Sequence, residues 1–315
     1  MSARDVTPDE SSELQGLWQA AKQGDRRALA RLLTLAGQSE HKPTLYRLLA
    51  HSSPPRSSLV SAITGSPGAG KSSLIGKMLP LIRQQGHTVA VLACDPRSPL
   101  TGGALLGDRI RMPVTVEDQG IYIRSLATPP GRQGIAESLD IRVGILEHSG
   151  FDWILVETVG VGQGDVAVRD LVDCVVLLIP PESGDEIQWE KAGLLELADL
   201  VVVSKGDMPG ATRTAAQLQQ TLNLPGFPPK QILVVSVARN LGIAELVKQL
   251  HEQPRRRHAP ERRGQRLLLL AQEILAERFA ERKDLVQGVL AEARRQGWDD
   301  WQAANELVHW LMTHE

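Results

Sequence analysis

The chain has 315 residues, of which 42% are hydrophobic, and a formal net charge of −2. This length allows one large core with helical additions, or two domains. The near-neutral charge argues against a protein that binds nucleic acid over its whole surface. The two cysteines, Cys94 and Cys174, lie in apolar runs without metal or redox spacing, and we interpret them as core residues.

The amino-terminal sequence MSARDVTPDE is polar and acidic and has no apolar stretch like that of a secretory signal. Apolar runs elsewhere fall far short of the roughly 20 residues that a transmembrane helix needs. We therefore expect a soluble cytoplasmic protein with no membrane contact.

The first part of the chain is predicted to be helical. Residues 12–50 carry apolar side chains at helical spacing, including Leu29, Leu32, Leu33 and Ala36. Asp25 stands where an N-cap is expected, and the segment 51–58 with its two prolines marks a boundary. These features predict a helical extension over residues 1–52.

Short runs rich in Val, Ile and Leu begin near residue 58. They read LVSAIT, TVAVLA, IYIRS, WILVE, CVVLLI, LVVVS and ILVVS. Most are apolar throughout, which indicates strands buried on both faces and a mainly parallel sheet. Helix-like stretches such as 72–85 and 135–148 separate them. This alternation predicts an α/β fold with a doubly wound sheet over residues 53–252.

The segment after the first of these strands reads GSPGAGKS and matches the pattern GxxxxGK[ST]. Glycines allow the backbone N–H groups to surround a phosphate chain, and the helix that follows adds positive charge at its N-terminus. Lys71 is expected to reach the β- and γ-phosphates, and the Ser72 hydroxyl to bind Mg²⁺. The predicted phosphate-binding residues are Gly65, Ser66, Pro67, Gly68, Ala69, Gly70, Lys71, Ser72 and Ser73.

A second motif addresses the base. Ser204-Lys205-Gly206-Asp207 ends a predicted strand where GTPases have [NT]KxD. The Asp207 carboxylate can accept hydrogen bonds from guanine N1–H and its exocyclic amine, a pair that adenine lacks. Ser204 replaces the usual Asn, a loss of about 1 kcal/mol in hydrogen bonding. Ser236, Val237 and Ala238 occupy the place of a third base-contacting loop, although a charged strand-to-loop turn is the alternative for the tetrapeptide.

Three acidic residues stand at or near predicted strand ends. Asp95 and Glu157 each end a buried strand, and Asp108 lies in a glycine-bracketed loop. The carboxyl edge of an open α/β sheet is where ligands bind, and carboxylates with retained waters suit Mg²⁺. Each acid by itself could equally be a solvated loop residue.

Two long stretches, AVLACDPRSPLTGGALLGDRIRM (90–112) and WILVETVGVGQGDVAV (153–168), strongly resemble the MeaB/ArgK/MMAA GTPases. These are P-loop NTPases of the signal-recognition-particle-like class. They act as chaperones of adenosylcobalamin-dependent acyl-CoA mutases such as methylmalonyl-CoA mutase. The resemblance covers roughly residues 20–250. It implies GTP hydrolysis to GDP and phosphate, Mg²⁺ as cofactor and no tightly bound cofactor of the chain's own.

The resemblance also implies roles for individual residues. It places Ser72, Asp95, Asp108 and Glu157 around Mg²⁺, with the three acids also near the γ-phosphate. Gly160 takes the place of the DxxG switch, and residues 181–193 that of a third switch that touches the mutase. The expected catalytic residues are Lys71, Asp95, Asp108, Glu157 and Lys191, the last reaching toward the nucleotide from the third switch.

This chain departs from the family pattern at several switch positions, which are Gly164, Asp165, Pro181, Glu182 and Trp189. The departures bear on the identity of the partner more than on GTP hydrolysis. Further arginines could stabilise charge during hydrolysis or form surface ion pairs instead. They are Arg109, Arg111 and Arg124.

The carboxyl-terminal part is predicted to be a helical arm over residues 253–315. Its basic segment 255–266 carries no interleaved aromatic residues for base stacking, so we interpret it as a solvated linker that does not bind nucleic acid. The helices that follow resemble the family's dimerisation arm and predict a homodimer, with packing on the chain's own GTPase domain as the alternative. His87, His148 and His251 are isolated in sequence, which argues against a structural metal site.

Three functions follow as hypotheses. The first is a GTPase chaperone of a B12-dependent mutase, gating cofactor loading and protection or reactivation. The second is a GTPase metallochaperone, although this chain has no His-rich tail or Cys/His ligand pair. The third is an ATP-dependent kinase, which the guanine-type motif at Ser204–Asp207 disfavours.

Overall fold

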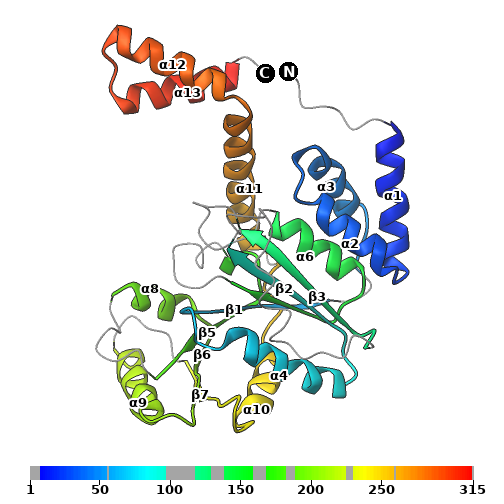
Figure 1. Ribbon diagram of the computed structural model, residues 1–315, viewed down its shortest axis with the longest axis vertical. Helices are drawn as coiled ribbons and strands as arrows, with labels where there is room; N and C mark the ends of the chain where they lie inside the picture. Colours follow the sequence, from blue (N-terminus) through cyan, green and yellow to red (C-terminus); the bar gives the residue numbers. More distant parts are fainter. Residues whose placement is uncertain are drawn as a thin grey trace. The chain divides into compact units, whose positions relative to one another are not determined.

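A computed structural model describes residues 8–54, 57–96, 118–128, 138–158, 168–181, 189–224, 230–258 and 260–313. The chain divides into two compact units, Met1–Arg262 and Arg263–Glu315. The first contains a seven-stranded, wholly parallel sheet with helices on both faces (Figure 1). This confirms the predicted α/β fold.

Every predicted apolar run forms a strand, and the strands lie in the order β3-β2-β4-β1-β5-β6-β7. β1, at the centre, is paired with β4 and β5. The strand bounds are β1 Leu59–Gly65, β2 Val89–Pro96, β3 Ile121–Thr128, β4 Trp153–Glu157, β5 Cys174–Ile179, β6 Leu200–Val203 and β7 Ile232–Val234. β1, β4, β5 and β6 are buried along their whole length, as their continuous apolar sequences predict.

Helices cover the two faces of the sheet. α4 (Lys71–Gln84) and α10 (Ile243–His251) pack on one face through residues such as Ile75 and Leu246. On the other face α6 (Leu139–His148) packs over Val156 and its neighbours, while α8 (Trp189–Leu197) and α9 (Ala211–Leu222) pack over Val201 and its neighbours. The sheet therefore has a helical layer on each side.

The amino-terminal helices pack on the core at the α6 face. It consists of α1 (Pro8–Lys22), α2 (Arg26–Leu35), the short helix Ser39–His41 and α3 (Lys42–Ala50). Asp25 caps α2, as predicted, by accepting from the backbone N–H groups of Arg27 and Ala28 at 2.8 and 3.1 Å.

Arg124 makes contacts that the sequence did not predict. Its guanidinium group donates to the Ala30 carbonyl at 3.2 Å and to the Thr34 hydroxyl at 2.7 Å. These bonds fasten the β3 edge of the sheet to α2. These contacts are not ones that either sequence-based alternative, charge stabilisation or a surface ion pair, predicts. Arg109 and Arg111 lie outside the described residues.

The sequence predicts that the basic segment after α10 is a solvated linker. The structure shows that part of this segment is buried. The Arg257 side chain is buried against Glu147 of α6, with which it forms an ion pair. Its backbone N–H donates to Asp173 at 2.6 Å. Arg255 and His258 are exposed, so these two residues agree with the prediction of a solvated linker, whereas Arg257 does not.

The three histidines that are isolated in sequence each have a ring neighbour. The rings of His87 and His251 lie 5.2 Å apart, and His251 stacks on Trp153 at 5.9 Å. His148 packs against Trp18 at 5.1 Å and bonds the Gly144 carbonyl. These contacts explain the histidines as packing residues. In the parts of the chain that the structure describes, no group of three or more His, Cys, Asp or Glu residues could hold a metal ion.

The second unit consists of helices. α11 (Pro260–Glu281) leads into it, and α12 (Lys283–Gln296) packs on α13 (Asp300–Thr313) around a small core of Val289, Ala293 and Ala303. Several large apolar side chains of these helices are exposed, namely Leu267, Leu268, Ile274, Leu275, Leu290, Trp301 and Val308. Among the described residues, no helix is both long enough and apolar enough to span a bilayer.

Candidate nucleotide-binding site

The GSPGAGKS segment forms a tight turn between β1 and α4. Gly65 has a φ of 145°, and a Cβ there would lie 2.3 Å from the Leu178 carbonyl oxygen of β5. Gly70 has a φ of 93° and precedes the first residue of α4. Both positions need glycine, the first because β5 approaches closely and the second because the backbone is left-handed. As the N-cap, Gly70 has no side chain that could cover the first-turn N–H groups, which suits an anion.

Lys71 is buried at the start of α4 and already lies across this turn. Its ammonium group donates to the carbonyl oxygens of Gly65 at 2.8 Å and Ser66 at 3.3 Å. An ammonium held by these carbonyls lies beside the loop whose N–H groups would bind phosphate oxygens. The loop geometry and Lys71 together define an anion site.

Ser72 and Glu157 meet beside the turn. The Ser72 hydroxyl donates to Glu157 Oε1 at 2.6 Å, and both side chains are buried. Glu157 is brought there by β4, because it is paired with Ile63 of β1 and with Ala93 of β2. A hydroxyl oxygen and a carboxylate oxygen are the ligand types that Mg²⁺ prefers, so this pair fits the metal.

The other predicted metal and catalytic residues are placed only in part. The backbone of Asp95 lies near the end of β2, two residues beyond Ala93, at the same edge as Glu157. Lys191 belongs to α8. The side chains of Asp95 and Lys191 lie outside the described residues, as do Asp108 and Gly160 altogether.

The two predicted base-contacting segments lie against each other. The Ser236 hydroxyl donates to the Asp207 carboxylate, and the Gly206 N–H donates to the Val235 carbonyl at 2.7 Å. The Arg239 N–H in turn donates to the Ser236 hydroxyl at 3.1 Å. The hydrogen bond from Ser236 holds the pKa of Asp207 below its ordinary value. Asp207 is therefore a carboxylate at neutral pH, as an acceptor of two guanine donors must be.

Ser236 thus has a contact that the sequence did not predict. It was expected to face the base, whereas its side chain orients the carboxylate of Asp207. The only sequence signal was its position in the third segment, because nothing in the spacing pairs residues 207 and 236. Val237 and Ala238 follow in the same turn.

Ser204 and Lys205 complete this end of β6. The Ser204 N–H donates to the Ile179 carbonyl of β5 at 3.0 Å. Its hydroxyl is buried and has no hydrogen-bond partner among the described residues. A buried hydroxyl of this kind costs free energy unless it is paired, so it is a candidate contact for a bound ligand. Lys205 has a φ of 51°, an uncommon left-handed conformation for a lysine.

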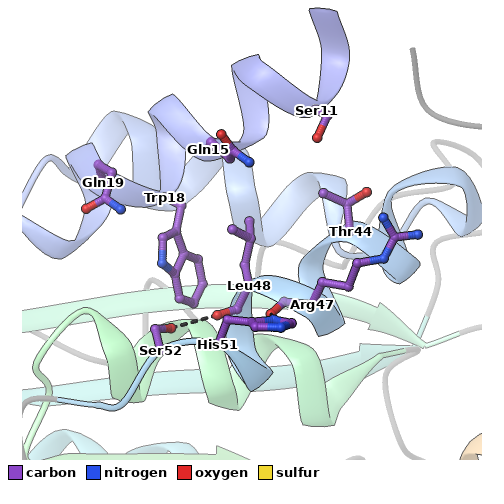
Figure 2. Close-up of a pocket in the computed structure, with 9 residues that line it drawn as sticks. All are labelled: Ser11, Gln15, Trp18, Gln19, Thr44, Arg47, Leu48, His51 and Ser52. Carbon is purple, nitrogen blue, oxygen red and sulfur yellow. Dashed lines mark hydrogen bonds between the residues drawn. The ribbon is translucent and has the colours of Figure 1, made fainter. Parts of the chain in front are cut away.

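A groove of about 330 Å³ lies in the same unit between α1 and α3 (Figure 2). Polar side chains from both helices surround the buried Trp18, and the Ser52 hydroxyl donates to the Leu48 carbonyl at 2.7 Å. No residue predicted to bind nucleotide or metal lines this groove. Its lining residues are Ser11, Gln15, Trp18, Gln19, Thr44, Arg47, Leu48, His51 and Ser52.

A parallel sheet, a glycine-rich turn with Lys71 between β1 and a helix, and an adjacent Ser–Glu pair define a P-loop nucleoside triphosphatase. The family model described as "Methylmalonyl Co-A mutase-associated GTPase MeaB" matches residues 29–286, and the chain belongs to this family. The resemblance read from the sequence is thereby confirmed, as is the activity as a GTPase.

Relatives with curated names agree. A protein of Pyrococcus abyssi named as a GTPase is 42% identical over 243 residues, which cover 73% of each chain. GTPase ArgK of Escherichia coli is 36% identical over 197 residues, which cover 62% of this chain and 60% of that one. The mouse protein named methylmalonic aciduria type A homolog, mitochondrial, is 40% identical over 198 residues, 60% of this chain and 48% of that protein.

Among solved structures, one titled LAO/AO transport system kinase superposes with a TM-score of 0.62. It is 22% identical in sequence, and the match covers 96% of this chain and 98% of that one. At this identity the likeness supports the fold.

Proposed function

We propose that this GTPase is Mg²⁺-dependent and serves as a chaperone of an adenosylcobalamin-dependent acyl-CoA mutase of the methylmalonyl-CoA mutase type. In this proposal GTP binding and hydrolysis gate cofactor loading and the protection or reactivation of the mutase. The observation that carries the metal and nucleotide part is the 2.6 Å hydrogen bond from Ser72 to Glu157 beside the P-loop. Family membership supports the partner, since the family description names a methylmalonyl-CoA mutase.

The chain's own residues would perform hydrolysis mainly by positioning and charge stabilisation. Backbone N–H groups of the P-loop and of the first turn of α4 would hold the phosphates. Lys71 would transfer its hydrogen bonds from the loop carbonyls to the β- and γ-phosphate oxygens. Mg²⁺, held by Ser72 and the acidic residues, would supply further neutralisation of the charge that develops on the phosphates. Asp207 would select guanine, and its orientation is fixed by Ser236.

Intrinsic turnover is expected to be slow, because no described residue near the P-loop is a strong base. A partner that orders the loops around the γ-phosphate would then accelerate hydrolysis. The third-switch region differs from the family pattern at residues that include Pro181, Glu182 and Trp189. We propose that these differences adapt the chain to its own mutase partner.

The first experiment measures phosphate release from GTP with and without cobalamin-loaded methylmalonyl-CoA mutase, with ATP as the control nucleotide. A several-fold rise with the mutase, for GTP only, is the expected result. Slow GTP turnover that the mutase leaves unchanged would contradict the proposed mutase partner but agree with the assignment of GTP as substrate. Equal turnover of ATP would overturn the guanine assignment.

We also propose that the chain forms a homodimer through its carboxyl-terminal helices. Among the described side chains of α11–α13, seven large apolar ones are exposed, and Trp301 is 77% exposed. The internal core of α12 and α13 is small. A second copy of the same surface would cover these side chains in an isologous interface, the commonest form of assembly.

A further inference from the structure

The carboxyl-terminal end of α8 is held by basic side chains from two other parts of the chain. Lys230, just before β7, donates to the Leu195 carbonyl and to the Glu196 carbonyl at 2.7 Å. Arg169, between β4 and β5, donates to the Leu197 carbonyl. The last carbonyls of a helix have no partner within it and carry partial negative charge, so cations stabilise them.

Asp199 follows directly and connects α8 to two more elements. Its Oδ2 atom accepts from the Val175 N–H of β5 at 2.9 Å. Its Oδ1 atom accepts from the Arg256 guanidinium at 3.0 Å, in the segment that leads toward α11. One carboxylate therefore joins the start of β5 to this segment. We call Arg169, Lys230, Asp199, Arg256 and the carbonyl groups of residues 195–197 the α8 junction.

The neighbouring residue Arg257 is fixed by two more acids. Its N–H donates to Asp173 Oδ1 at 2.6 Å, and Asp173 Oδ2 accepts from the Val60 N–H of β1 at 2.9 Å. Its guanidinium pairs with Glu147, and both side chains are less than 10% exposed. In both Asp173 and Asp199, one carboxylate oxygen accepts a hydrogen bond from a strand N–H group. The other oxygen accepts from residue 256 or 257. The segment is therefore built into the amino-terminal edge of the sheet.

Two connections lead from the nucleotide site to this junction. One leaves β4 after Glu157, beside Ser72, and contains Arg169. The other leaves β5 one residue after Leu178, which is paired with Gly65 of the P-loop, and contains α8. Because the sheet is parallel, both must cross from its carboxyl edge, where nucleotide binds, to its amino edge. They meet at the end of α8.

We infer that the α8 junction is a conformational relay that transmits the nucleotide state from the P-loop edge of the sheet to the segment 255–262. This inference rests on the proposed GTPase cycle. The junction bonds a helix end, so a small displacement of α8 along its axis changes the distances to Arg169 and Lys230 and the position of Asp199. Hydrogen bonds weaken steeply with poor geometry, so such a displacement would alter the hold on Arg256.

The charges at the junction make it sensitive to such displacement. Burial and the neighbouring charge of Arg169 lower the pKa of Lys230. Two cations thus share one helix end and repel each other, and the carbonyls and Asp199 offset that repulsion. A movement of the helix end therefore changes several coupled interactions at once, namely the repulsion between the two cations and their attraction to the carbonyls and to Asp199.

Hydrogen exchange on the full-length protein tests the relay. Peptides covering residues 66–75 and 255–262 would be followed with GDP and with a non-hydrolysable GTP analogue. The Arg257 amide is a direct reporter because it is bonded to the buried Asp173. We expect exchange in the 255–262 peptide to differ at least twofold between the two nucleotides. In the variant Arg256→Gln that difference should disappear while GTP hydrolysis without a partner stays within twofold.

Arg255→Gln is the matched control. Arg255 carries the same charge in the same segment, but it is exposed and its guanidinium donates to the Gln253 carbonyl at 2.9 Å. It should keep the nucleotide-dependent difference. Equal exchange of the 255–262 peptide in both nucleotide states, with the 66–75 peptide protected, would overturn the relay and leave the GTPase function intact. Failure of both nucleotides to protect the 66–75 peptide would overturn both proposals.

Discussion

Asp207 illustrates at the residue scale how the site would select its base. Its carboxylate is oriented by Ser236 and kept ionised, so both oxygens can accept hydrogen bonds. Replacement by an amide would leave one acceptor and introduce a donor.

For Asp207→Asn we expect the Kd for GDP to rise at least about tenfold, equivalent to about 1.4 kcal/mol. Affinity for xanthosine diphosphate should increase, because the additional carbonyl of xanthine can accept from the new amide. Isothermal titration with both nucleotides measures the change. Asp284→Asn makes the same chemical change in α12 and should alter neither affinity. Unchanged GDP affinity in Asp207→Asn would remove this residue from the base site.

Ser204 supports a second prediction, because its buried hydroxyl has no partner among the described residues. Ser204→Ala should leave the stability of the unliganded protein nearly unchanged and weaken GDP binding by about 1 kcal/mol. Ser61→Ala is the matched control, since the Ser61 hydroxyl of β1 is likewise buried without a described partner. If both variants bind GDP like the wild type, Ser204 has no contact with nucleotide.

A third prediction concerns Ser72, which would contribute both a hydrogen bond to Glu157 and a metal ligand. In Ser72→Ala, GTP hydrolysis at saturating Mg²⁺ should fall at least about tenfold, or about 1.4 kcal/mol in activation free energy. Phosphate release over a magnesium titration measures both rate and metal dependence. Ser149→Ala is the control, because among the described residues that hydroxyl donates to the Ile145 carbonyl in α6. A wild-type magnesium dependence in Ser72→Ala would count against the proposed metal site.

At the scale of secondary-structure elements, a buried ion pair joins α6 to the segment that follows α10. Glu147 of α6 pairs with Arg257 and lies 3.4 Å from the ring of His258. Burial by itself raises the pKa of Glu147, but the hydrogen bond from His258 and the charge of Arg257 outweigh it and hold the pKa below its ordinary value of 4.5.

This shift predicts a loss of stability in acid. A carboxyl group with a lower pKa in the folded state binds fewer protons there than in the unfolded chain. Its contribution to stability is therefore present above pH 4.5 and is lost as the pH falls below 4.5 through the folded-state value. His258→Gln should raise the folded-state pKa and move the acid-unfolding midpoint to higher pH. Circular dichroism over a pH series tests this, with His309→Gln on α13 as the control. An unchanged midpoint in His258→Gln would contradict the assigned cause.

The elements that sequence predicted best are those with strong local signals. All seven apolar runs became strands. The signal is strongest in β1, β4, β5 and β6, because a strand buried on both faces must be apolar throughout. The P-loop was predicted because its glycines and Lys71 are adjacent in sequence. The contacts of residues 256 and 257 were not predicted, because their partners are distant in sequence. Asp199 lies 57 residues from Arg256, and Asp173 and Glu147 lie 84 and 110 residues from Arg257. A run of arginines in sequence does not show which acids the fold brings to it.

At the scale of the whole molecule, the second unit has a small internal core but exposes several large apolar side chains. Its internal cluster contains Val289, Ala293 and Ala303, whereas Trp301 is 77% exposed. In a homodimer formed by these helices, a charge at position 301 would be buried at the interface and would oppose association.

We therefore expect Trp301→Glu to shift the protein from dimer to monomer and raise its dimer dissociation constant at least about tenfold. Analytical ultracentrifugation over a concentration series measures this. Gln302→Glu adds the same charge on the same helix, where the side chain already accepts from the Asp299 N–H at 3.0 Å, and should leave the mass unchanged. A wild-type protein that is monomeric throughout the series would contradict the proposed dimer.

The bonds from Lys71 to the carbonyls of Gly65 and Ser66 have a kinetic consequence. The ammonium group joins two carbonyl groups of the loop and so stabilises the conformation of the loop. Binding then exchanges these acceptors for phosphate oxygens and requires little folding of the loop itself. Nucleotide capture should consequently proceed at a rate set mainly by diffusion and charge attraction, and differences in affinity among related nucleotides should arise from how long each stays bound.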